Sequence, residues 1–343
     1  MTASGIPCAS DAPMVSVVMA NHNGAAYLAE AIDSVRQQSL QALELIISDD
    51  GSSDDSVALV ERAMHEDARI RLIRSEWNAG PAAARNRALA LARGRWIAIM
   101  DSDDLMDPER LATLVEAASR DGADMVADDL VAFRSDDRRP ISHLLTGAWA
   151  RAPFWVDIAD YVRLNRFYGP GPALGYLKPL FRASLLEAGA ARYDETLTIA
   201  EDYDLVLRLL HGGAKFLVCP LGLYFYRRHQ DSTSHRLNQR ALRALEAADL
   251  RFQQQVSRAE PRLALEVAAR LRSIRTALAY EDLLAALKAE RWLHAVGIAL
   301  ARPKAAALLR LPIAVRLRRL LPAWSRSAPL VAAPHHGEMK VGE

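Results

Sequence analysis

Residues 78–104 read NAGPAAARNRALALARGRWIAIMDSDD, and this stretch decides the fold. Its first half is rich in alanine and has Pro81 at a natural first-turn position, so we predict a helix over Gly80–Ala92. The apolar run Trp96–Met100 that follows is typical of a buried strand. The stretch ends in three aspartates within the four residues Asp101–Asp104. A helix followed by a buried strand with a polar end is one unit of an α/β sheet.

The same alternation continues on both sides of this stretch. Apolar runs predict further strands at Val15–Ala20, Leu43–Ser48, Ile70–Ile73, Asp124–Ala127, Phe216–Val218 and Leu223–Tyr226. Helical spacing predicts helices at Ala25–Gln37, Asp54–Met64, Pro108–Arg120 and Ile199–Leu210. Strands that alternate with helices of this length predict an α/β fold with a doubly wound, Rossmann-like and mainly parallel sheet. Region 133–177 shows no regular pattern, and Gly169–Pro172 predicts a loop.

A change in composition divides the chain. From about residue 236 onward the sequence is helix-forming and rich in Ala, Leu and Arg. We predict a flexible N-terminus over 1–13, the α/β domain over 14–235, a helical basic C-terminal region over 236–330 and a disordered tail over 331–343.

The overall charge balance hides an asymmetry between these parts. The chain has 43 Lys and Arg against 42 Asp and Glu, yet no acidic residue occurs from Arg291 to Gly337, where eight basic residues stand. A basic tail beside an acidic body indicates an anionic partner, and an anionic inner membrane is one candidate. The alternative is a helical cap that packs on the α/β domain with its arginines in water.

Cysteine usage and apolar runs limit the compartment. Cys8 and Cys219 form no CxxC pair or Cys/His cluster, which excludes a zinc motif and a disulfide scaffold. Met1–Pro13 lacks the basic and apolar regions of a signal peptide. The apolar segments of the tail are too short to span a bilayer, which requires about 20 residues. We therefore expect a cytoplasmic protein, with any membrane contact peripheral and on the inner face.

The aspartates at 101–104 predict a metal site. The carboxylates of Asp101, Asp103 and Asp104 would repel one another unless a cation lay between them, and hard oxygen ligands suit Mg²⁺ or Mn²⁺. Such an ion, shared with a diphosphate, neutralises charge on a departing phosphate. The alternative is a solvated acidic turn followed by a helix cap from Asp107.

Two further clusters follow predicted strands and suit a nucleotide. In Asp49–Asp54 (DDGSSD), a carboxylate can accept hydrogen bonds from a ribose hydroxyl or a base N–H. In Asn78–Pro81, Gly80 permits a sharp turn before a helix whose N-terminus could face phosphate, and Arg85 lies one turn further on. The structural alternatives are an ordinary turn and a capped helix with a surface arginine.

Two further polar clusters lie near residue 200 and beyond. Glu201 and Asp202 open a predicted helix, where an ionised carboxylate can accept a hydroxyl proton or simply stabilise the helix dipole. The run Tyr226–His229 places a histidine beside two arginines, with Ser232 and Ser234 after it. An isolated histidine is more often structural than a ligand.

Taken together, these motifs resemble the inverting family-2 glycosyltransferases of the GT-A fold. The resemblance rests on VSVVMANHNGAAYL from Val15, DDGSSD at 49–54, the run at 78–104, AEDYDLVLRL at 200–209 and YRRHQDSTS at 226–234. It covers about Val15–Ser234, so it implies that 14–235 is a GT-A catalytic domain. It further implies a nucleotide-sugar donor and a Mn²⁺ or Mg²⁺ cofactor.

The resemblance also implies residue roles. Asp50 would contact the nucleotide base, Asp101 the ribose or the metal, and Asp103 would be the principal metal ligand. Asp202 would be the general base, with Glu201 beside it. The remaining implied nucleotide or metal contacts are Asn21, Asn23, Asn78, Arg85 and His229. Asn21 and Asn23 stand where the family often has a Tyr–Asn pair, so the residue that stacks on the base stays open.

A narrower resemblance concerns the acceptor. The stretch GADMVADDLVAF at 122–133 is similar to bacterial exopolysaccharide glucosyltransferases of the succinoglycan type. It implies a UDP-hexose donor, a glycan or polyprenyl-linked oligosaccharide acceptor, and work at the inner membrane.

Other protein classes fit the sequence less well. No GxGxxG follows the first strand, which argues against a Rossmann dehydrogenase. The DSDD motif follows the fourth strand and is followed by Leu105, unlike the motif of an aspartate-nucleophile phosphatase. A sugar nucleotidyltransferase would need a Gly-rich, Arg-bearing loop after the first strand. The tail carries no groove-reading motif, so we predict no nucleic-acid partner. A non-catalytic nucleotide-sugar-binding or scaffold protein of a polysaccharide assembly complex remains the alternative function.

Overall fold

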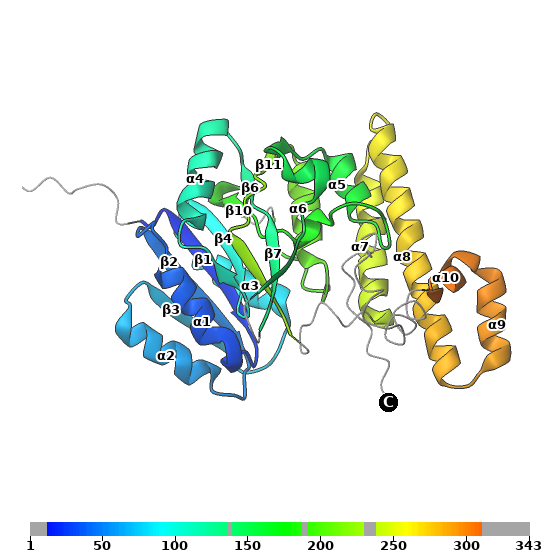
Figure 1. Ribbon diagram of the computed structural model, residues 1–343, viewed down its shortest axis with the longest axis horizontal. Helices are drawn as coiled ribbons and strands as arrows, with labels where there is room; N and C mark the ends of the chain where they lie inside the picture. Colours follow the sequence, from blue (N-terminus) through cyan, green and yellow to red (C-terminus); the bar gives the residue numbers. More distant parts are fainter. Residues whose placement is uncertain (1–11, 136–138, 187–190, 230–237, 311–343) are drawn as a thin grey trace, which may run out of the picture. The chain divides into compact units, whose positions relative to one another are not determined.

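A computed structural model describes residues 12–135, 139–186, 191–229 and 238–310 (Figure 1). These residues form two compact units. Unit 1 lies within Met1–Trp155, Leu177–Glu195 and Gly212–Arg227, and unit 2 within Val156–Tyr176, Thr196–His211 and Arg228–Glu343. Two segments before residue 235, at 156–176 and 196–211, group with the C-terminal helices, and the predicted division at residue 235 stays a prediction. The predicted termini 1–13 and 331–343 lie almost wholly outside the described residues.

Unit 1 is built on an eight-stranded, mainly parallel sheet, which confirms the predicted fold class. The strand order is β3-β2-β1-β4-β10-β6-β11-β9. The strands are β1 Val15–Asn21, β2 Leu43–Asp50, β3 Ile70–Ser75, β4 Trp96–Asp101, β6 Met125–Ala127, β9 Phe154–Trp155, β10 Leu180–Arg182 and β11 Phe216–Val218. Strands β3, β2, β1 and β4 pair in parallel, whereas β10 runs antiparallel between β4 and β6. The central strands are buried on both faces, as parallel sheets are.

Helices cover this sheet, and a second sheet adjoins it. The helices are α1 Ala25–Arg36, α2 Ser56–Glu66, α3 Pro81–Leu89 and α4 Arg110–Asp121. Helices α1 and α2 lie side by side in front of β1–β3 (Figure 1), and α3 packs on β1 and β2. The second sheet has the order β5-β12-β7-β8, with β5 Leu105–Met106, β7 Leu130–Arg134, β8 Pro140–His143 and β12 Tyr224–Arg228. Short 3₁₀ turns occur at Gly147–Ala150 and Ala183–Leu185.

Unit 2 is helical. Its helices are α5 Ile158–Leu164, α6 Glu201–His211, α7 Gln239–Gln255, α8 Pro261–Lys288, α9 Trp292–Ala301 and α10 Pro303–Ala307, with a 3₁₀ turn at Leu174–Tyr176. Phe167 packs with Leu242, Leu245, Ile274 and Ala277 in one apolar core. The predicted helical C-terminal appendage is therefore present. Among the described residues, no helix has the length and apolar character needed to cross a bilayer.

The largest differences from the sequence prediction fall in the region without a pattern. Residues 133–177 contain β8, β9 and α5, and Leu180–Arg182 forms β10, none of which we predicted. Each of these strands has only two to four residues, too few for an apolar period to show. The predicted loop at Gly169–Pro172 is irregular as expected. The strand ends also shift, because Asp49, Asp50 and Asp101 belong to the strands that they were expected to follow.

Candidate active site

Three neighbouring parallel strands of unit 1 end at one edge of the sheet. The strand register places Asn21 of β1 opposite Asp49 of β2, and Ala20 opposite Asp101 of β4. The carboxyl edge of a parallel sheet is where α/β proteins bind ligands. The predicted clusters at 21–24, 49–54 and 101–104 therefore meet at one place.

The loops after β1 and β2 are held together by side chains. Asp49 accepts hydrogen bonds from Asn21 Nδ2 at 3.0 Å and from the Ser52 hydroxyl at 2.6 Å. The Asn23 backbone N–H donates to Ser52 Oγ at 2.9 Å, and Asn23 Oδ1 accepts from the Ser53 N–H at 2.8 Å. The Asn21 Oδ1 atom is buried and accepts no hydrogen bond from the described residues.

Asp50 organises the loop that leads into α3. Its buried carboxylate accepts from the backbone N–H groups of Ala79 at 3.0 Å and Gly80 at 2.7 Å, and from Arg87 Nη2 at 2.5 Å. Asn78 Oδ1 also accepts from the Gly80 N–H, at 2.9 Å. Gly80 has φ +95°, a conformation that favours glycine. Asp50 and Asn78 thus shape the predicted nucleotide-binding loop.

Asp101 lies between two positive side chains. Arg85 Nη2 donates to its Oδ1 at 2.6 Å, and Lys178 Nζ lies 2.8 Å from its Oδ2. Burial alone would raise the pKa of Asp101, but the charges of Lys178 and Arg85 outweigh it and hold that pKa well below its usual range. Asp101 is therefore ionised, and the Arg85 guanidinium and the Lys178 ammonium group already balance its charge.

Asp103 and Asp104 complete an acidic cluster with Asp101. Oxygen atoms of the three carboxylates lie within 4.8 Å of one another. Asp104 is fully buried and accepts from the Tyr224 hydroxyl at 2.7 Å and the Arg227 N–H at 2.8 Å. Burial, together with the charges of Asp103 and Asp101, raises the pKa of Asp104 well above its usual range. Closely spaced carboxylate oxygens fit a hard divalent cation.

The other predicted site residues belong to unit 2. Glu201 and Asp202 form the first turn of α6, directly after Ala200, which has φ +57°. Glu201 is buried and Asp202 is partly buried. His229 directly follows β12 and is partly buried, whereas Ser232 and Ser234 lie outside the described residues. The roles predicted for these residues stay predictions.

Four residues with clear contacts at this edge were not among our predicted site residues. They are Lys178 on Asp101, Arg87 on Asp50, Tyr224 on Asp104 and Arg227, whose Nε donates to the Asp103 backbone oxygen at 2.7 Å. Buried Arg227 also pairs with Glu30 at 2.7 Å. The sequence signal for Arg227 was its position in the Tyr226–His229 run. Lys178 and Tyr224 carry no local signal.

Known proteins resemble this chain along most of its length. Residues 16–185 match the model of the Glycosyl transferase family 2 domain. The chain is 35% identical over 336 residues to the succinoglycan biosynthesis protein ExoO of Rhizobium meliloti, covering 95% of this chain and 93% of that protein. It is also 35% identical over 206 residues to ExoU of the same organism, covering 60% of this chain and 59% of that protein.

Solved structures share the fold at low identity. TarS of S. aureus, in complex with UDP-GlcNAc, matches with a TM-score of 0.56 at 17% identity. The match covers 83% of this chain and 90% of the TarS chain. The mannosyltransferase PcManGT of Pyrobaculum calidifontis, in complex with GDP-Man and Mn²⁺, has a TM-score of 0.56 at 20% identity, covering 89% and 81%. These two structures show the fold, and the family match together with the similarity to ExoO shows that the chain belongs to glycosyltransferase family 2 and is a glycosyltransferase.

Proposed function

We propose that this protein transfers a hexose from a UDP-sugar to a hydroxyl of a glycan or polyprenyl-linked oligosaccharide, with inversion at the anomeric carbon. The observation that carries the proposal is the meeting of Asn21, Asp50 and the 101–104 carboxylates at one sheet edge. The similarity to ExoO over 95% of this chain supports a place in exopolysaccharide biosynthesis. The solved complexes of TarS and PcManGT with UDP-GlcNAc and GDP-Man support a nucleotide-sugar donor.

The donor side is assigned to unit 1. We assign the nucleoside to the edge of β1 and β2, beside Asn21, whose Nδ2 donates to Asp49. The loop of Asn23, Asp50 and Asn78 would form the wall of this subsite. Arg85 and Lys178 bring positive charge to the side where a diphosphate would lie.

A divalent cation fits the acidic cluster. We assign it to Asp103 and Asp101, with Mn²⁺ or Mg²⁺ as the metal and His229 as a further candidate ligand. Asp104 is a weaker candidate because both of its oxygens accept hydrogen bonds from the protein. When bound, the cation would neutralise negative charge on the leaving diphosphate.

The proton transfer is assigned to α6. The acceptor oxygen attacks the anomeric carbon while the bond from that carbon to the diphosphate oxygen breaks, and the nucleoside diphosphate leaves with the electron pair. The acceptor hydroxyl loses its proton to the Asp202 carboxylate, and Glu201 stands beside it in the first turn. Direct displacement of this kind inverts the anomeric configuration.

Donor turnover tests the proposal. UDP- and GDP-sugars should be hydrolysed slowly, or should stabilise the protein against heat, only when Mn²⁺ or Mg²⁺ is present. We expect Asp103→Asn to lose this metal-dependent effect by a factor of about 100 or more, since it removes a charged metal ligand. The matched control is Asp33→Asn on α1, whose side chain is 56% exposed. Full metal-dependent turnover in the Asp103 variant would contradict the assignment.

A second variant separates binding from transfer. Asp202→Asn should bind the donor as the wild type does but lower transfer by a factor of about 100 or more, because the amide accepts no proton. Unchanged transfer would assign the base elsewhere. Binding without turnover by the wild type, for any donor and acceptor glycan, would favour a scaffold protein. The anomeric configuration of the product, read by NMR, tests inversion.

A further inference from the structure

Helix α9 in unit 2 has two apolar faces, and only one of them is covered. Ala295 is buried in a cluster with Leu283 and Ala286 of α8, and Ile298 packs against the same cluster. On the other side, the exposed fractions are 63% for Trp292, 91% for Leu293, 56% for Val296 and 79% for Leu300. At about 100° of rotation per residue, these four side chains fall within an arc of about 100°. We call them the α9 stripe.

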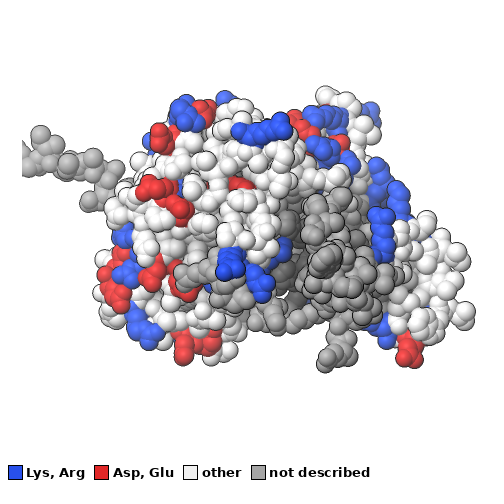
Figure 2. Space-filling view, viewed as in Figure 1, with Lys and Arg blue, Asp and Glu red and all other residues white. Residues whose placement is uncertain are grey.

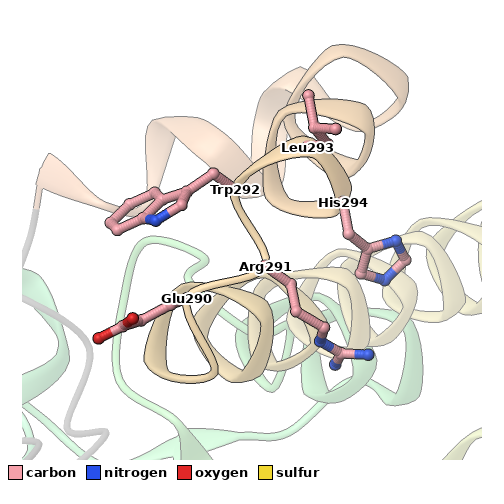
Figure 3. A pocket seen from close by; sticks show the side chains of 5 residues that line it. All are labelled: Glu290, Arg291, Trp292, Leu293 and His294. Carbon is pink, nitrogen blue, oxygen red and sulfur yellow. The ribbon is translucent and has the colours of Figure 1, made fainter.

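The start of the α9 stripe borders a hollow of about 410 Å³, lined by Glu290, Arg291, Trp292, Leu293 and His294 (Figure 3). Figure 3 shows Trp292 and Leu293 projecting from the first turn of α9, whereas the Arg291 and His294 side chains point away from Leu293. Figure 2 shows a largely uncharged surface over α9 and α10. A tryptophan at the end of an exposed apolar stripe is typical of side chains that lie at a lipid headgroup boundary.

Basic residues outnumber acidic ones around the α9 stripe. Arg291 precedes α9, and Arg302 and Lys304 follow it, all three exposed. Glu290 is the last acidic residue before the stripe, and no Asp or Glu follows until after Gly337. An apolar stripe in a segment without carboxylates complements a bilayer, whose acyl chains are apolar and whose headgroups can be negatively charged.

We propose that the α9 stripe is a docking surface for an anionic lipid bilayer, with Trp292, Leu293, Val296 and Leu300 inserted at the headgroup boundary and Arg302 and Lys304 on the lipid phosphates. The helix has ten residues and lies along the surface rather than across it. This inference goes beyond the transferase proposal and does not rest on it. It assigns the contact to α9.

Flotation of the full chain with liposomes tests the proposal. The protein should float with vesicles of phosphatidylcholine and phosphatidylglycerol, and much less with phosphatidylcholine alone or at high salt. Leu293→Glu should lower the partition coefficient at least about tenfold, since it removes a leucine that would insert into the bilayer and adds a negative charge. The matched control is Leu265→Glu on α8, whose leucine is 70% exposed, and it should float as the wild type does.

Two further readouts separate the parts of the proposal. Arg302→Gln and Lys304→Gln should each lower binding about fivefold at low salt, the effect of one basic residue near an anionic surface. Lipids brominated in the acyl chain should quench part of the emission of the wild type, and Trp292→Phe should lose that part. Wild-type flotation by Leu293→Glu would overturn the proposal. Equal binding to neutral and anionic vesicles would overturn it too, as would a wild-type dimer that Leu293→Glu converts to a monomer without any lipid binding.

Discussion

Asp101 shows how much a single residue at this edge depends on its neighbours. Both of its oxygens have a positive partner, Arg85 at 2.6 Å and Lys178 at 2.8 Å, and the Lys178 side chain is 9% exposed. A lysine that is buried against a carboxylate holds that carboxylate in the charged form before any ligand arrives. Lys178 and a divalent cation would therefore both neutralise Asp101.

We predict that Lys178→Met lowers the free energy of unfolding by about 2 kcal/mol, less than a fully buried broken pair would cost because Arg85 remains and Asp101 is partly exposed. Mn²⁺ should raise the melting temperature of this variant more than that of the wild type, since the ion replaces the lost charge. Urea denaturation and thermal unfolding with and without Mn²⁺ measure both effects. The control Lys215→Met, at an exposed lysine of unit 1, should show neither change.

At the scale of elements, the two ends of the parallel strands differ in their role. The candidate site lies at the carboxyl ends of β1, β2 and β4, whereas hydrogen bonds to Glu44 of β2 hold the amino ends together. The buried Glu44 carboxylate accepts from the Ser16 hydroxyl of β1 at 2.7 Å and from Arg93, just before β4, through its N–H at 2.9 Å and its Nη2 at 2.9 Å. One side chain thus fixes three strands relative to one another.

This fastening predicts a pH-dependent stability. Burial raises the pKa of Glu44, but hydrogen bonds from Ser16 and Arg93 outweigh it, so the folded-state pKa lies below the ordinary value of 4.5. The carboxylate therefore stabilises the fold above about pH 4.5, and this contribution is lost as the pH falls through the folded-state pKa. Glu44→Gln should lower the free energy of unfolding by about 1–2 kcal/mol at pH 7.

Urea denaturation from pH 7 to pH 3 measures the effect. The difference between the wild type and Glu44→Gln should shrink below about pH 4.5, where the unfolded wild-type chain binds a proton on Glu44 before the folded chain does. Glu61→Gln on α2, whose glutamate side chain is 54% exposed, should match the wild type at every pH. If the difference in the free energy of unfolding stayed constant from pH 7 to pH 3, the effect of Glu44→Gln would come from altered packing and not from the lost charge.

At the scale of the whole molecule, the sequence predicted what long apolar runs determine. Strands β1, β2 and β4 were predictable because each has six or more residues that are mostly buried. Strand β10 was not, since its three residues gain their place only by pairing between β4 and β6. Lys178 escaped prediction for the same reason, because only the folded chain brings it to Asp101. Short elements and distant ion pairs leave no local period.

The division of the chain at residue 235 stays a prediction at this scale, and the packing within unit 2 suggests how to test it. Tyr203 of α6 stacks on Tyr161 of α5 at 5.3 Å, and the Arg270 guanidinium of α8 lies 3.7 Å from the Tyr203 ring centre. Arg270 is itself buried and paired with Asp249 of α7 at 2.9 Å. Helices α5 and α6 therefore share their core with helices that begin after residue 235.

We predict that the chain ending at residue 235 loses the folded structure of α5 and α6 and, with Asp202 at the start of α6, sugar transfer. The truncation removes the fully buried Leu242 and Leu245, each worth about 2–5 kcal/mol, against a total stability of about 5–15 kcal/mol for a typical domain. The chain ending at residue 310 keeps every described contact of unit 2 and should unfold as the full chain does. Calorimetry and proteolysis of segments 156–176 and 196–211 compare the two, and a cooperative, active chain ending at 235 would restore the predicted boundary.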